Sequence, residues 1–94
     1  MTYTQDAAEA LALEALGWLA GNEDLLPVFM GATGVSAGEL RAQAAAPEFL
    51  GAVLDFLLMD DAWVIAFCDA AGRAYTDVAA ARAALPGGAQ VNWT

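Results

Sequence analysis

The strongest constraint on the fold is a pattern that the sequence repeats after 38 residues. Two leucines, a phenylalanine and a glycine recur at this offset. In order, Leu16, Leu19, Phe29 and Gly34 return as Leu54, Leu57, Phe67 and Gly72. Leucines three residues apart lie on one face of a helix, and a glycine after an apolar segment is typical of a helix end. We therefore predict an all-α protein, built as a pseudo-repeat of two units with three short helices each.

Start and stop signals place three helices in the first half. A Thr4 N-cap opens the first, which stops at Gly21. Asn22 is expected to cap the second, which ends in the glycine-containing segment 31–34. Ser36 and Glu39 have the spacing of a capping box, which predicts a third helix from Ala37 to near Ala46.

The second half repeats this arrangement. Pro47 at a first helical position opens the fourth helix. Asp60 is expected to cap the fifth, which stops at Gly72, and Thr76 the sixth, which ends at Leu85. We expect one domain over residues 1–94, with a folded body at 4–86 and a tail at 87–94.

The apolar spacing predicts which helix faces are buried. At 100° per residue, one arc of the first helix collects its apolar side chains and Leu13 falls outside it. This arc contains Ala8, Leu11, Ala12, Ala15, Leu16, Trp18 and Leu19. In the fourth helix, Glu48, Gly51 and Asp55 alone are left to face water. That helix is therefore expected at the centre of the molecule.

Charge narrows the class of partner. The 94 residues contain 12 acidic and 3 basic side chains, with a formal net charge of −9. Nucleic acids and anionic membrane surfaces are disfavoured, because both are bound through Lys and Arg. A basic protein would be attracted by the same field. We expect a protein partner or a second copy of the chain, including a homodimer.

The most apolar stretch does not read as a membrane span. Residues 49–67 contain three aspartates, and a span needs about 20 nearly uncharged residues. The first 16 residues carry acids where a secretion signal needs an apolar segment. The single cysteine, Cys68, cannot form an internal disulfide. We expect a cytoplasmic protein without a membrane segment.

Catalytic chemistry has few candidates. The chain lacks His and Lys, and Cys68 stands beside Asp69, which does not favour a thiolate. The aspartates Asp55, Asp60 and Asp61 have the chemistry of ligands for a hard cation. They are explained with no ion if Asp60 caps a helix, Asp61 complements the helix dipole and Asp55 lies at the solvent edge. We expect no catalytic residue, no metal and no cofactor.

Three segments carry a resemblance to a known family. They are AEALALEALGWLAG at residues 8–21, TGVSAGELR at 33–41 and FLGAVLDFLLMDDAWVIAF at 49–67. Through them the chain resembles a small bacterial family, mainly alphaproteobacterial, known as a domain of unknown function. The likeness covers roughly residues 8–87. It implies an all-helical fold and supplies no activity, cofactor or catalytic residue.

Function follows as ranked hypotheses. The leading one is a protein-interaction or oligomeric domain, because apolar side chains in excess of one small core leave apolar surface uncovered. The alternative is a carrier or sensor of a small apolar ligand held between helices. A carboxylate-based metal-dependent enzyme ranks last. The candidate interaction or pocket residues are Trp18, Phe49, Val53, Phe56, Trp63, Phe67 and Trp93.

Overall fold

A computed structural model describes residues 3–86. It contains six α-helices, one short 3-10 helix and, over these residues, no strand, which confirms the all-α prediction. The elements are α1 (Gln5–Ala20), α2 (Leu26–Thr33), η1 (Ala37–Glu39), α3 (Leu40–Gln43), α4 (Pro47–Leu58), α5 (Asp61–Ala71) and α6 (Asp77–Ala83). The predicted tail at 87–94, with Trp93, lies outside the described residues.

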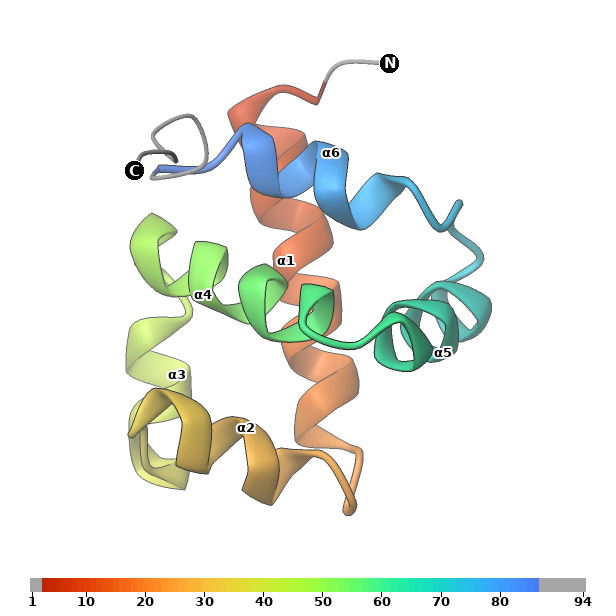
Figure 1. Cartoon of the computed structure of the whole chain (residues 1–94). Coiled ribbons are helices and arrows are strands. Elements are labelled where there is room, and N and C mark those ends of the chain that lie inside the picture. Colours follow the sequence, from red (N-terminus) through yellow and green to blue (C-terminus); the bar gives the residue numbers. More distant parts are fainter. Residues whose placement is uncertain (1–2, 87–94) are drawn as a thin grey trace, which may run out of the picture.

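Helix α1 is the long axis on which the other helices are arranged (Figure 1). Helix α6 crosses one end of it, α4 packs against its middle, and α2 lies near its other end. Helix α4 contacts α1, α2, α5 and α6. The central position predicted for the fourth helix is therefore confirmed.

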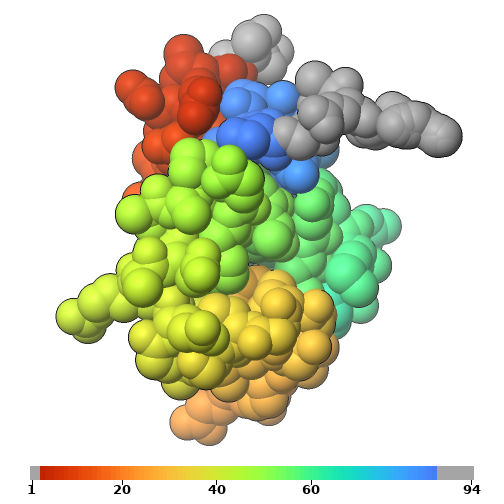
Figure 2. Space-filling view, turned by 90° about the vertical axis from the view of Figure 1, so that its left-hand side faces the viewer, coloured from red at the N-terminus to blue at the C-terminus, as the bar shows by residue number. Residues whose placement is uncertain are grey.

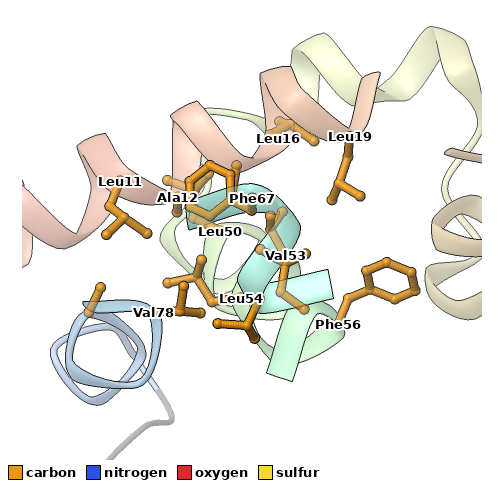
Figure 3. Close-up of a cluster of buried hydrophobic side chains, with 14 of the residues drawn as sticks. Leu11, Ala12, Leu16, Leu19, Leu50, Val53, Leu54, Phe56, Phe67 and Val78 are labelled. Carbon is orange, nitrogen blue, oxygen red and sulfur yellow. The ribbon is translucent and has the colours of Figure 1, made fainter. Parts of the chain in front are cut away.

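The core forms where α1 and α4 face each other (Figure 3). The apolar arc of α1 is buried as predicted, except that Trp18 is half-buried, and Leu13 outside the arc is 47% exposed. Leu50, Val53 and Leu54 oppose this arc from α4, while Phe67 of α5 and Val78 of α6 close the cluster.

Local capping sets several helix ends as predicted. The Thr4 hydroxyl accepts a hydrogen bond from the Ala7 N–H at 3.1 Å, and Asp60 Oδ1 accepts one from the Ala62 N–H at 2.9 Å. Gly34 and Gly72 follow α2 and α5 with φ of 76° and 70°. This left-handed conformation favours glycine, which has no Cβ to clash with the backbone.

Two helix boundaries in the first half differ from the prediction. Helix α2 begins at Leu26, and Asn22 Oδ1 instead holds a turn by accepting from the N–H groups of Asp24 and Leu25. The reason is Pro27, which has no N–H to bond the carbonyl four residues earlier.

The third helix is also shorter than expected. Ser36 and Glu39 form the predicted capping box, in which the Ser36 N–H donates to Glu39 Oε1 at 2.9 Å. The first turn is nevertheless 3-10, and α3 ends at Gln43 rather than near Ala46. Ala46 precedes Pro47 and is extended, with φ −90° and ψ 119°, because a following proline disfavours the helical conformation.

In the second half, both predicted ends of the sixth helix are wrong. The Thr76 side chain makes no capping hydrogen bond; its backbone is already helical, with φ −79° and ψ −12°, whereas a capping residue is usually extended. The Asp77 carboxylate accepts from the Ala74 N–H instead, at 3.1 Å, and α6 ends at Ala83 rather than at Leu85.

Gly51 is buried rather than facing water. The Arg82 guanidinium of α6 covers it so closely that a Cβ added at Gly51 would lie 3.0 Å from Arg82 Nη1. The spacing of apolar residues in α4 carries no information about an arginine that arrives from another helix.

Candidate interaction site

Six of the aromatic residues form two separate clusters. In the first, the Phe29 ring lies edge-on to the rings of Phe49 and Phe56, with centroids 5.9 and 5.2 Å away. Trp63 extends this cluster by stacking on Phe56 at 4.6 Å. In the second, Trp18 lies edge-on to Phe67 at 5.8 Å. The predicted site residues are thus not gathered into one pocket.

The predicted residues also differ in burial. Val53, Phe56 and Phe67 are at most 3% exposed and belong to the core. Trp18, Phe49 and Trp63 are half-buried, so each offers part of its ring to the surface. Trp93 lies outside the described residues. Among the predicted residues that the structure describes, these three rings therefore expose the most surface to another molecule.

Two surface hollows each bring two of the predicted residues together, and the first contains Phe49 and Phe56. It lies between α2 and α4, has a volume of about 320 Å³, and opens to solvent. Its lining is Ala32 and Thr33 from α2 with Phe49, Ala52, Asp55, Phe56 and Met59 from α4 and its C-cap. We call it the α2–α4 groove. Figure 2 shows the face of the molecule where α2 and α4 meet.

The groove follows a regular stripe of side chains. Phe49, Ala52, Phe56 and Met59 are spaced by three, four and three residues, which places them in one line along a helix. A neighbouring hollow of about 290 Å³ shares Thr33 and Phe49 with the groove and continues it toward Glu39 and Gln43. The combined surface is therefore elongated rather than round.

Exposed apolar residues that the sequence prediction missed lie in this groove and near it. Met59 lines the groove and is 71% exposed. Val28, one helical turn before Ala32 on α2, is 48% exposed. A detectable signal existed, namely the three-four-three spacing that ends at Met59, but a helix apolar on nearly all sides gives no indication of which side stays uncovered.

The rim of the groove is acidic and partly neutralised. Asp55 pairs with Arg82 through two contacts, from Nε at 2.6 Å and from Nη2 at 3.1 Å. Glu48 and Asp60, next to the two ends of the stripe, are exposed.

The Trp18 cluster faces a different hollow. Glu14, Trp18, Phe67, Ala70 and Ala71 line a volume of about 370 Å³. Arg73 holds the Glu14 carboxylate with two hydrogen bonds, of 2.8 and 2.9 Å. These hydrogen bonds lower the pKa of Glu14. The Glu14 carboxylate is therefore already occupied by an ion pair with Arg73 of the same chain.

The remaining candidate groups have structural roles. Cys68 is buried as core filler, its Sγ donates to the Ala74 carbonyl at 3.4 Å, and burial raises the pKa of its thiol. Asp61 is exposed in the first turn of α5. Over residues 3–86, no group of three or more His, Cys, Asp or Glu side chains is arranged to hold a metal ion.

Within the described part of the chain, every helix is either too short or too polar to cross a bilayer. The cytoplasmic location stays a prediction.

Comparisons with known proteins agree with the resemblance seen in the sequence. No curated protein and no solved structure matches the chain. The family model described as "Protein of unknown function (DUF3572)" matches residues 5–88, which is most of the chain. The match carries no information on the source organism, so an alphaproteobacterial origin stays a prediction. On this match, the chain belongs to the DUF3572 family of proteins of unknown function.

Proposed function

We propose that this protein is an interaction module that binds a basic, amphipathic helix of another protein in the α2–α4 groove. The observation that carries the proposal is the line formed by Phe49, Ala52, Phe56 and Met59, which ends at a methionine that is 71% exposed. Exposed apolar side chains grouped beside a groove are typical of surfaces that bind other proteins.

The shape of the groove favours a helix over a compact ligand. From Phe49 to Met59 the stripe is about 15 Å long, at 1.5 Å per residue. A partner helix that lies in such a groove presents apolar side chains at every third and fourth position. Two to three turns of such a helix match this length. Methionine suits this role, because its unbranched side chain adapts to different partners.

The charge of the chain favours a basic partner. With a net charge of −9, the protein repels a second copy of itself and attracts a cationic segment. Glu48 and Asp60 stand next to the two ends of the stripe, where the flanks of a bound helix would place Lys or Arg. This argument puts a basic helix ahead of the homodimer that the sequence also allowed.

A synthetic peptide tests the proposal directly. The probe is a 16-residue helix with leucines on one face and lysines or arginines on the other, titrated while the fluorescence of the full chain is recorded. Trp63 stacks on Phe56 of the groove and is therefore a reporter. We expect binding that weakens with added salt, and at least about tenfold weaker binding to Met59→Glu, which corresponds to about 1.4 kcal/mol.

The controls separate the groove from general stickiness. Leu13→Glu changes an exposed leucine on α1, outside the groove, and should bind the peptide like the unchanged protein. A scrambled peptide of the same composition should bind weakly. Equal binding to both variants, or no binding at all, overturns the proposal. Light scattering at tens of micromolar tests for a dimer. If the protein is a dimer and Met59→Glu is a monomer, the groove binds a second copy of the chain instead.

A further inference from the structure

The last described residue, Pro86, is held by an arginine that covers the α6 side of α4. Arg82 Nη1 donates to the Pro86 carbonyl at 3.0 Å, while Nε and Nη2 of the same guanidinium bind Asp55, which lines the groove. Because the guanidinium is planar and rigid, these contacts fix Pro86 close to the outer face of α4. The chain that follows Pro86 therefore starts beside Arg82, whose guanidinium binds Asp55 at the edge of the groove.

The sequence after Pro86 fits the groove in charge, length and pattern. Residues 87–94, GGAQVNWT, contain no charged side chain in a protein with a net charge of −9. Eight residues reach at most about 26–29 Å when extended, which exceeds the length of the stripe of about 15 Å. Val91 and Trp93 are two positions apart, so an extended segment directs both to the same side.

We propose that residues 87–94 bind in the α2–α4 groove of their own chain, with Val91 and Trp93 against the end of the stripe that carries Met59. The segment then competes with the partner helix, so this inference rests on the proposed function. A short connection gives the segment a millimolar effective concentration at the groove, so even weak contacts suffice. A neutral segment also avoids the repulsion that opposes the approach of a second, acidic copy.

The methyl group of Met59 reports on docking in the full chain. In ¹³C-methyl-methionine-labelled protein, assigned with Met59→Leu, we expect Trp93→Ala to shift the Met59 methyl resonance, because the ring current of the indole is lost. Met30, half-buried on α2 and outside the groove lining, serves as the internal control. Asn92→Ala should leave the Met59 signal unchanged, since an extended segment directs residue 92 away from the groove.

Competition for the groove is the second measurement. If the segment occupies the groove nine-tenths of the time, Trp93→Ala raises the affinity for the basic peptide about tenfold. A Met59 signal that Trp93→Ala does not move overturns the docked segment, even where the peptide binds and the proposed function survives. If Trp93→Ala shifts the Met59 signal but no peptide binds, the docked segment is supported. The proposed function and the competition are then overturned. A shift that grows with protein concentration assigns the segment to a second copy and overturns the inference.

Discussion

The two halves of the chain, related by the 38-residue offset, place the same residues at the same kinds of position. Phe29 and Phe67 are both buried, and Gly34 and Gly72 both end a helix with a left-handed backbone. The leucine pairs of α1 and α4 are buried as well. The helices differ in length, however, with 16 residues in α1 against 12 in α4 and 8 in α2 against 11 in α5. The pseudo-repeat itself stays a prediction.

The halves differ in how they are attached to the core. The two ion pairs among the described residues both use arginines of the second half, Arg73 with Glu14 and Arg82 with Asp55. Helix α6 buries Val78 and Ala81, whereas η1 and α3 bury no residue. Shared helix signals therefore do not decide where the surface stays open. The groove borders α2 of the first half, which takes part in neither ion pair and buries only Phe29.

The largest expected effects test whether the paired positions are equivalent. We expect Phe29→Ala and Phe67→Ala each to lower the free energy of unfolding by about 3–5 kcal/mol, because each empties a buried ring site. Urea unfolding measures both. Costs that differ by more than about 1.4 kcal/mol, a tenfold change in the unfolding equilibrium, would break the equivalence.

An intermediate effect is expected at the paired glycines. Gly34→Ala and Gly72→Ala should each cost about 1–2 kcal/mol, because a Cβ strains a left-handed residue. An added Cβ meets no atom within 4 Å at either site, so the cost is conformational rather than a clash. Gly17→Ala within α1 is the control and should raise stability by about 0.5–1 kcal/mol. Thermal unfolding that ranks Gly17→Ala with the other two would refute this explanation.

The smallest effect concerns the ion pair that fastens the second half to α1. The Glu14 pKa is lowered in the folded protein, so the stabilisation is present above the unfolded pKa of about 4.3 and is lost as pH falls through the folded pKa. The Glu14 side chain is 48% exposed, which limits the contribution to at most about 1 kcal/mol. We expect Glu14→Gln to lower stability at pH 7 and to match the unchanged protein near pH 2. An equal loss at both pH values would instead indicate a packing role.

Much of the fold was predictable because its signals are local. Thr4, Asp60 and Gly72 act on backbone groups within a few residues, so their roles can be recognised from neighbouring sequence. The errors arise where another constraint dominates. Pro27 delays α2, the backbone of Thr76 does not suit a cap, and Gly51 is covered by Arg82 from a distant part of the chain.

The candidate site was predictable only in part. Large aromatic residues were chosen from the sequence as candidates, and two of them, Phe49 and Phe56, line the groove together. Burial of Val53 and Phe67, and exposure of Met59, depend on how α2, α4 and α5 pack together. Helical spacing identifies residues on one face of α4, but a helix with apolar residues on most sides does not reveal which face has a neighbour.

Arg82 can form its ion pair with Asp55 in this position only because residue 51 has a hydrogen atom in place of a Cβ. A methyl group at position 51 would push the guanidinium outward by a few tenths of an ångström, away from a place where it is 17% exposed. Water would then compete for both the Asp55 carboxylate and the Pro86 carbonyl. Alanine is usually well tolerated in a helix. At this position, however, its methyl group would weaken the contacts of Arg82 with Asp55 and with Pro86.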